Sequence, residues 1–413
     1  MRSPLFFVIT LGILLLLDLY IFQAVKVLTT TSRYRQYIYY AFWLVSLLCI
    51  LGLLLFVFTD PDFLGRKIRM YIFAFVVMLF LSKLIAVVFL ITDDLRRIAL
   101  WTITKGFSAT PEKSEVNNHI SRSAFLSWLG LAAGSTLFGT MVYGLSNKYN
   151  YTIKRLQLSF NNLPASFKGF KILQISDIHS GSLTDINAVA HGVQMIMKHE
   201  ADVILFTGDL VNDRADEMKV FLDLFSKLSA PMGVFSILGN HDYGDYVHWP
   251  YHGITKEQNL ENLKKIHAKL GWHLLLNEHV ILERGGEEIA LLGIENWSAK
   301  SNFPSFGKLD EAYKGTEQFP FKILMSHDPS HWDAEVRPKY PDIDLMLSGH
   351  THGMQFGVEL PGVKWSPVQY MYKQWAGLYE EANQKLYVNR GFGFIGYPGR
   401  VGILPEITII EFS

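Results

Sequence analysis

The 413-residue chain has a single cysteine, Cys49, which lies inside an apolar run. One cysteine cannot form a disulfide framework or a thiolate metal site within one chain. The chain also lacks an excess of charge of either sign, because 38 lysine and arginine residues balance 38 aspartate and glutamate residues. Nucleic-acid-binding domains usually carry a strongly basic surface, so we expect no nucleic-acid partner.

Apolar residues make up 49% of the chain and are concentrated before about residue 146. A bilayer is crossed by about 20 consecutive apolar residues in a helix. The sequence therefore predicts an all-α transmembrane region of four helices over residues 1–145. The four predicted spans are Leu5–Leu28, Ile38–Phe58, Tyr71–Ile91 and Ala124–Leu145.

Two of these spans contain a charged residue, Asp18 in the first and Lys83 in the third. A charge at membrane depth is a functional-site hypothesis by default. The structural alternative is that Asp18 pairs with a neighbouring helix or that Lys83 extends to the interface. The sequence leaves both open.

The orientation follows from the basic residues that flank the spans. The first and third loops carry slightly more lysine and arginine than the opposite side, which favours these loops inside and the C-terminal half outside. The segment from Ser121 to Gly134 reads either as an export signal that has lost its second arginine or as an ordinary span. We expect a multi-pass protein of the inner membrane, with its second half on the outer, periplasmic face.

From about Tyr151 the pattern changes to short apolar strands that alternate with amphipathic helices. Two glycines, Gly285 and Gly286, are expected to turn a hairpin. This alternation predicts a layered α/β domain with mixed sheets. The expected organisation is a membrane region over 1–145, a linker over 146–150 and the α/β domain over 151–413.

Five of the predicted strands end in polar clusters. Ligand groups in open α/β sheets collect at the carboxyl ends of strands, so we expect these clusters to converge. The clusters read "SDIH", "GDLVND", "GNHD", "SHD" and "GHTHG". They supply two carboxylates, one amide and four imidazoles from Asp177, His179, Asp209, Asn240, His327, His350 and His352.

Seven oxygen and nitrogen ligands exceed the needs of one ion. They suit two divalent cations of the manganese, iron or zinc type. Residues two apart in an extended segment point to the same side, which places Asp177 with His179 and His350 with His352. A bridging carboxylate would hold the two ions about 3.5–4 Å apart.

This ordered set resembles the calcineurin-like metallophosphoesterase superfamily, whose pattern is D-x-H, G-D-x-x-D/N, G-N-H-D/E, H and G-H-x-H. The resemblance covers about Tyr151 to Ser413, with Asn212 as the last residue of the second motif. Within the superfamily the chain resembles bacterial membrane-anchored or exported phosphoesterases, although Met354 stands where that group often has glycine. The resemblance implies a four-layer sandwich of two mixed sheets flanked by helices.

The resemblance also implies a role for each matching position. Asp209 would bridge the two metals and His241 would face the scissile phosphate. The first metal would be held by Asp177, His179 and His352, and the second by Asn240, His327 and His350.

Three further roles follow from chemistry. His241 could act as a general acid. Asp242, or with less support Asp213, would orient the His241 ring. Arg400 is a candidate for binding the substrate's phosphate. The aromatic loop that contains Trp249 either walls the substrate pocket or touches the bilayer.

The expected function is a membrane-tethered, metal-dependent phosphoesterase that cleaves phosphodiester or pyrophosphate bonds. Its substrate would be a phosphoester, with a lipid or cell-envelope component as a candidate. The alternatives are a transmembrane sensor or transporter with a ligand-binding domain, and a nucleotide phosphodiesterase. The sequence does not indicate an oligomeric state.

Overall fold

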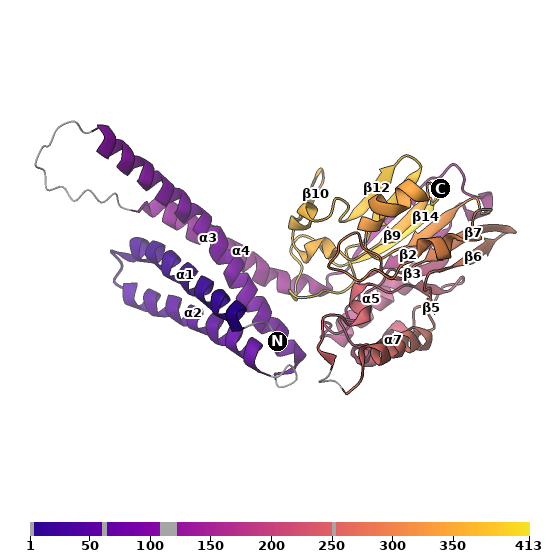
Figure 1. Ribbon diagram of the computed structural model, residues 1–413, viewed down its shortest axis with the longest axis horizontal. Helices are drawn as coiled ribbons and strands as arrows, with labels where there is room; N and C mark the ends of the chain where they lie inside the picture. Colours follow the sequence, from indigo (N-terminus) through magenta and orange to yellow (C-terminus); the bar gives the residue numbers. More distant parts are fainter. Residues whose placement is uncertain (1–3, 60–63, 108–121, 250–252) are drawn as a thin grey trace, which may run out of the picture. The chain divides into compact units, whose positions relative to one another are not determined.

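The computed structural model describes residues 4–59, 64–107, 122–249 and 253–413. The chain divides into two compact units, Met1–Tyr143 and Gly144–Ser413. Figure 1 shows the first as long helices and the second as a sheet-containing unit.

The first unit is built from four helices long and apolar enough to cross a membrane, counting only the described residues. The predicted transmembrane region is confirmed. The helices are α1 (Pro4–Thr29), α2 (Arg35–Phe58), α3 (Gly65–Phe107) and α4 (Ala124–Gly144).

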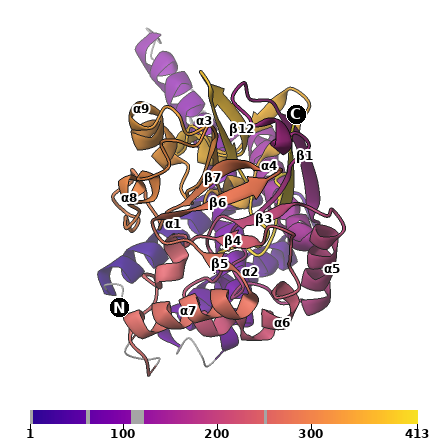
Figure 2. The ribbon, with the colours of Figure 1, turned by 90° about the vertical axis from the view of Figure 1, so that its right-hand side faces the viewer.

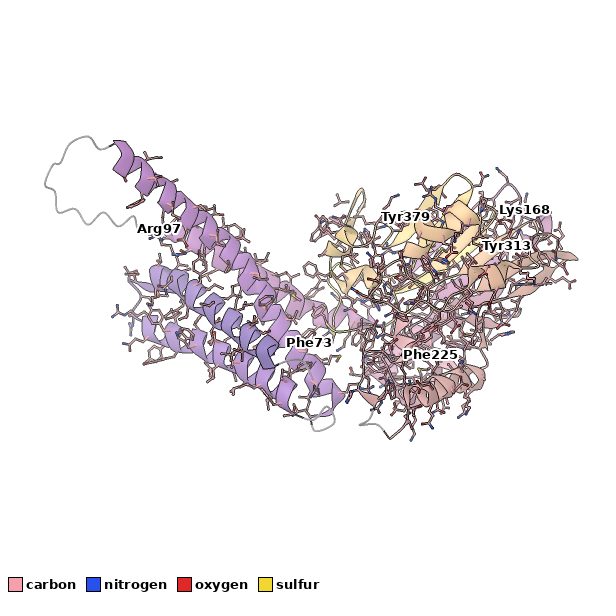
Figure 3. All side chains as sticks on the ribbon, in the orientation of Figure 1. Phe73, Arg97, Lys168, Phe225, Tyr313 and Tyr379 are labelled. Carbon is pink, nitrogen blue, oxygen red and sulfur yellow. The ribbon has the colours of Figure 1, made fainter. Side chains whose placement is uncertain are left out.

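Helix α3 is longer than the span predicted over Tyr71–Ile91. It continues through a charged segment in which Arg96 pairs with Asp93 at 2.8 Å and Arg97 pairs with Asp94 at 2.9 Å. Pairs three residues apart lie on one helix face and support the helix beyond its apolar part. The Arg97 side chain is labelled in Figure 3.

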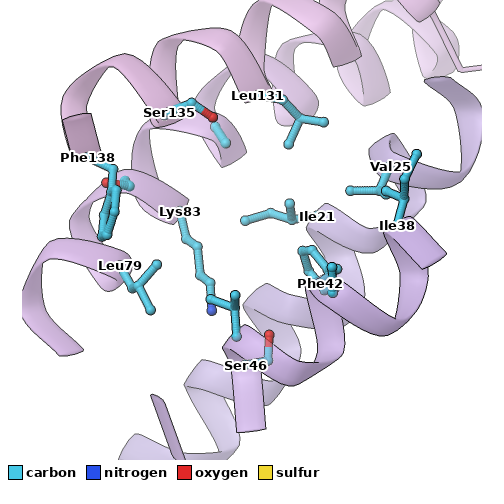
Figure 4. Close-up of a pocket in the computed structure, with 15 residues that line it drawn as sticks. Ile21, Val25, Ile38, Phe42, Ser46, Leu79, Lys83, Leu131, Ser135 and Phe138 are labelled. Carbon is cyan, nitrogen blue, oxygen red and sulfur yellow. The ribbon is translucent and has the colours of Figure 1, made fainter. Parts of the chain in front are cut away.

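The two intramembrane charges pair with each other. Lys83 Nζ lies 2.5 Å from Asp18 Oδ1, and the two side chains are 10% and 1% exposed. Lys83 also lines a cavity of roughly 450 Å³ whose other walls include Ile21, Ser46 and Phe138. Figure 4 shows the Lys83 side chain extending toward Ser46. The contact agrees with the structural alternative for Asp18, pairing with a neighbouring helix.

The second unit has two six-stranded mixed sheets. The first has the order β1 (Thr152–Leu158), β14 (Glu406–Phe412), β2 (Lys171–Ile175), β3 (Val203–Phe206), β4 (Val234–Ser236), β5 (His273–Leu274). The second has the order β12 (Gly377–Glu381), β13 (Gln384–Val388), β9 (Leu345–Ser348), β8 (Lys322–Met325), β7 (Glu287–Gly293), β6 (Glu278–Arg284).

The main core lies between these sheets and is formed by apolar side chains of both, including Leu205, Leu291 and Ile410. Figure 2 shows helices on opposite sides of the strands. They are α5 (Ile186–Met197), α6 (Leu222–Phe225) and α7 (Lys256–Leu270) beside one sheet, and α8 (Leu309–Tyr313) and α9 (Arg337–Lys339) beside the other. The predicted α/β fold with two mixed sheets is confirmed.

Local sequence signals explain several boundaries. Helix α7 begins after Thr255, whose hydroxyl accepts from Gln258 N, and ends at Gly271, which has φ 76°. These are the cap residues that helices favour. The hairpin predicted at Gly285 and Gly286 is confirmed, since Arg284 pairs with Glu287 across the turn.

The segment Glu217–Leu228 does not form one continuous helix, although its apolar pattern suits one. It contains most of a 3₁₀ segment, η3 (Ala215–Val220), followed by the short α6. Residues 146–150 include most of the 3₁₀ helix η1 (Leu145–Tyr149). The Asn147 side chain donates to the Arg400 carbonyl at 3.4 Å, so this segment packs as part of the second unit.

Candidate metal centre

Five strands deliver polar residues to one edge of the two sheets. Strands β2, β3 and β4 are parallel neighbours in one sheet, and β8 and β9 are parallel neighbours in the other. Their carboxyl ends therefore point the same way within each sheet. The residues that follow them are Asp177, Asp209, Asn240, His327 and His350.

The first donor group consists of Asp177, His179 and His352, whose ligand atoms lie within 4.8 Å of one another. His179 Nε2 lies 3.0 Å from His352 Nε2. His352 Nε2 lies 3.2 Å from Asp177 Oδ1. All three residues are buried, at 0%, 0% and 5% exposure.

The second donor group consists of Asp209, His327 and His350, whose ligand atoms also lie within 4.8 Å of one another. His327 Nε2 lies 3.1 Å from Asp209 Oδ2. Asn240 joins the group, because its Oδ1 lies 2.7 Å from His350 Nδ1.

Asp209 connects the two groups. Its Oδ2 lies 3.6 Å from His179 Nε2 in the first group and 3.1 Å from His327 Nε2 in the second. This is the position that a bridging carboxylate requires.

The backbone around these residues is strained. Positive φ angles occur at Asp177 (52°), Asp209 (61°), His350 (72°) and His352 (51°). Such conformations are rare outside glycine and persist where the surrounding structure imposes them. Gly349 is also required, because a Cβ there would lie 2.2 Å from Asp177 Oδ2.

Burial and neighbouring charges shift the pKa values of the donor residues in opposite directions. Burial lowers the pKa of His179 well below its ordinary value and also lowers the pKa of His350. Burial alone would raise the pKa of Asp177, but the His352 imidazole outweighs it and holds that pKa low. Burial alone would also lower the pKa of His327, but the Asp209 carboxylate outweighs it and raises that pKa to about 10. Because metal ions bind the neutral imidazole, a bound cation would take the place of the His327 proton.

The donor set fits divalent cations. His327 Nδ1 lies 2.7 Å from the carbonyl oxygen of Thr207, which accepts its hydrogen and turns Nε2 toward Asp209 Oδ2 at 3.1 Å. His179 Nε2 lies 3.0 Å from His352 Nε2 in the first group. Buried imidazole nitrogens that converge with carboxylate oxygens, with no sulfur among them, suit manganese, iron or zinc.

His241 lies beside the first donor group. Its ring centre is 4.9 Å from that of His179, and its backbone N–H donates to Asp209 Oδ1 at 2.8 Å. His241 Nδ1 lies 2.7 Å from the carbonyl oxygen of Asn212. The ring is therefore held next to the donors without being one of the two groups.

Asp242 is placed differently from the expectation. Its carboxylate does not orient His241 but accepts backbone N–H groups: Oδ2 from Gly239 and Asp209 at 2.8 and 2.9 Å, and Oδ1 from Leu210 and Val211 at 2.8 and 3.2 Å. Burial and the nearby Asp209 charge raise the pKa of Asp242 to about 7. Asp242 thus ties together the two loops that carry Asp209 and Asn240.

Arg400 is also placed differently. It is 0% exposed, and its guanidinium donates to the carbonyl oxygens of Arg390 at 2.8 Å and Gly391 at 3.2 Å. Its Nη2 lies 3.3 Å from His352 Nδ1. A contact between Arg400 and a substrate phosphate does not fit this position, and the side chain instead supports the loop behind His352.

Aromatic residues border the second donor group, and two of them, Tyr372 and Phe303, were not predicted from the sequence. The Tyr372 hydroxyl lies 2.7 Å from His350 Nε2. The Tyr246 hydroxyl accepts from Asn240 Nδ2 at 3.0 Å, and Phe303 packs edge-on against His350 with ring centres 4.7 Å apart. No motif marks Tyr372 or Phe303, whereas Tyr246 belongs to the aromatic loop that contains Trp249. Trp249 instead lines a separate pocket with Arg214.

Comparison with known proteins follows the same division of the chain. A family model described as calcineurin-like phosphoesterase matches residues 170–354. A second, described as probable calcineurin-like phosphoesterase, transmembrane domain, matches residues 1–148.

Three relatives illustrate the similarity. The uncharacterized metallophosphoesterase YkuE of Bacillus subtilis is 30% identical over 61% of this chain and 82% of that protein. The phosphodiesterase YaeI of Escherichia coli is 28% identical over 71% of this chain and 99% of that protein. A transmembrane protein with metallophosphoesterase domain from Danio rerio is 28% identical over 65% of this chain and 59% of that protein.

Proposed function

The chain belongs to the calcineurin-like phosphoesterase family, and we propose that it is a membrane-tethered hydrolase of phosphodiester or pyrophosphate bonds with two divalent metal ions. We assign the membrane region to residues 1–145 and the catalytic domain to residues 151–413. The observation that carries the proposal is the pair of donor groups, with Asp209 of the second group also within 3.6 Å of His179 in the first.

The proposed ligands divide as the donor groups do. Asp177, His179 and His352 would hold one ion, and His327, His350 and Asn240 the other. Asp209 would contact both. When bound, two such cations neutralise the charge of the phosphate ester and lower the pKa of a shared water.

The protein's own part is orientation and proton transfer. The Thr207 carbonyl fixes the His327 ring, and the Tyr372 hydroxyl contacts the His350 ring. His241 Nδ1 faces the Asn212 carbonyl, which leaves Nε2 for the departing oxygen of the substrate. A protonated Nε2 there can donate the proton that the leaving alkoxide needs.

Membrane attachment supports a lipid or cell-envelope phosphoester as substrate. The four spans would keep the catalytic domain near the headgroups of one leaflet. We propose the inner membrane and its outer, periplasmic face, from the balance of flanking basic residues. A reporter fused after Ser413 tests that orientation.

The central test uses the purified full-length protein in detergent with an aryl phosphodiester. Activity should require added manganese, iron or zinc and should be lost on chelation. Asp209→Asn and His350→Ala should abolish hydrolysis and lower bound metal. His191→Ala, at an exposed position of α5, is the matched control. Wild-type activity in the Asp209 and His350 variants would refute the site.

A further inference from the structure

The small hairpin formed by β10 (Val358–Leu360) and β11 (Val363–Trp365) has an unusual distribution of polarity. The register pairs Val358 with Trp365 and Leu360 with Val363. Because side chains alternate along a strand, these four apolar residues share one face. They are 42%, 37%, 63% and 54% exposed, in the order just given.

The opposite face of the hairpin carries its charged residues, Glu359 and Lys364. These side chains contact the rest of the second unit. Glu359 accepts from Arg390 Nη2 at 2.6 Å and lies 3.5 Å from Lys154 Nζ. Its partner Lys364 donates to the Ala376 carbonyl oxygen and lies 4.7 Å from the Trp375 ring centre. An ordinary surface hairpin has its polar face in water and its apolar face on the core. This one is reversed.

The apolar surface continues beyond the hairpin. Tyr370 and Met371 follow β11 and are 78% and 55% exposed. The Tyr370 side chain hydrogen-bonds that of Trp365, so it borders the hairpin. We call this set the hairpin patch. Contiguous apolar surfaces of this kind mark contact with another molecule or with a membrane.

Contacts within the second unit place the hairpin patch near the point where the chain leaves the membrane. Gly144, the last residue of α4, accepts from the backbone N–H of Arg400 at 2.9 Å. The next residue, Val401, accepts from Gly357 N at 2.8 Å, and Gly357 directly precedes β10. Through these two hydrogen bonds, the end of α4 and the start of the hairpin both contact the same segment, Arg400–Val401.

We propose that the hairpin patch inserts into the interfacial layer of the bilayer. Tryptophan and tyrosine are enriched at that depth, and aliphatic side chains bury in it. A lipid surface is favoured over a protein partner because the segment that contacts the hairpin also contacts Gly144, the last residue of the membrane-spanning helix α4. The proposal concerns membrane contact and does not depend on the proposed reaction.

Depth-dependent fluorescence quenching tests this proposal. A Cys49→Ser background removes the single native cysteine. Leu360→Cys is labelled with the polarity-sensitive dye NBD, and the full-length protein is reconstituted into phosphatidylcholine–phosphatidylglycerol vesicles. The matched control is Ile281→Cys on β6, which is apolar and 48% exposed but lies outside the hairpin patch.

We expect doxyl-labelled lipids to quench the probe at position 360 several-fold more than the probe at position 281. Aqueous iodide should show the reverse order. Equal responses at the two positions would overturn the proposal. So would a response at position 360 that rises with protein density at fixed lipid composition, since that indicates a second copy.

A second measurement guards against misfolding of the labelled variant. A probe at Val358→Cys should lose its lipid quenching when Val363→Asp is added. Unchanged quenching would count against insertion. Neither readout needs turnover, so failure of the proposed hydrolysis would leave this test intact.

Discussion

His241 Nδ1 lies 2.7 Å from the backbone carbonyl oxygen of Asn212. A carbonyl oxygen only accepts, so Nδ1 carries a hydrogen and Nε2 is the atom that gains or loses a proton. The same loop is fixed a second time, because His241 N donates to Asp209 Oδ1 at 2.8 Å. The proposed acid and the proposed bridging ligand are therefore held in one rigid arrangement.

His241→Ala should lower turnover of an aryl phosphodiester about 10²–10⁴-fold, the usual contribution of a general acid or base. Metal content should stay near the wild-type level, because His241 belongs to neither donor group. Turnover and metal analysis by mass spectrometry on the same preparation check this. Loss of bound metal would make His241 a ligand instead.

Asp242→Asn should lower the stability of the loops around the metal centre without changing any proposed metal ligand. The carboxylate accepts four backbone N–H groups with its two oxygens. An amide offers one oxygen, so at least one pair of buried donors loses its partner, at a cost of about 1–3 kcal/mol. We expect a lower thermal midpoint and weaker metal binding.

The matched control for this prediction is Asp245→Asn. Asp245 lies three residues away, is partly exposed and pairs with Lys256 at the surface. Exposed pairs contribute about 0–1 kcal/mol, so this variant should behave as wild type. Equal losses in both variants would contradict the role assigned to Asp242.

The site residues that could be predicted are those that belong to short sequence motifs. Each ligand follows an apolar strand within a few residues, as Asp177 follows β2 and His350 follows β9. The direction of parallel strands brings the motifs of each sheet to one edge, and the packing of the two sheets brings the two sets together. Short motifs that directly follow a predicted strand were therefore enough to identify the residues of the two donor groups.

The role of Asp242 and the burial of Arg400 were not predictable in this way. Asp242 receives N–H groups from residues about 30 positions earlier, and this long-range closure has no sequence signature. Strand β1 was also missed, because Lys154 and Arg155 interrupt its apolar pattern. It forms by pairing in parallel with β14, a contact between distant parts of the chain.

The Asp18–Lys83 pair predicts a non-additive double-mutant cycle. Removing one partner of a buried ion pair leaves an uncompensated charge and costs about 3–5 kcal/mol. Asp18→Asn and Lys83→Met should each reduce thermal stability in detergent. The double variant should be more stable than the sum of the single effects indicates.

Thermal unfolding of all four proteins gives the coupling directly. The control pair is Lys308→Met with Glu311→Gln, whose side chains are 58% and 54% exposed. Additive effects for Asp18 and Lys83 would show that the two charges do not stabilise each other in the membrane unit.

Acid sensitivity of the fold should depend on His267. This residue is 0% exposed on α7, and burial lowers its pKa to about 3. The unfolded chain binds a proton near the ordinary histidine pKa of about 6.5, so it binds more protons than the folded chain between these values. Stability linked to His267 is therefore fully present above about pH 6.5 and is lost as the pH falls toward about 3.

His267→Gln should flatten this dependence, because glutamine does not titrate. The change to measure is the slope of the thermal midpoint between about pH 4 and pH 6.5, rather than its absolute value. Substitution will also disturb the 2.9 Å contact between His267 Nδ1 and Ser236 Oγ, which shifts the midpoint at every pH. His191→Gln, at an exposed position, should leave the slope unchanged. If His267→Gln retained the full wild-type slope, the acid sensitivity would have to arise from other buried groups.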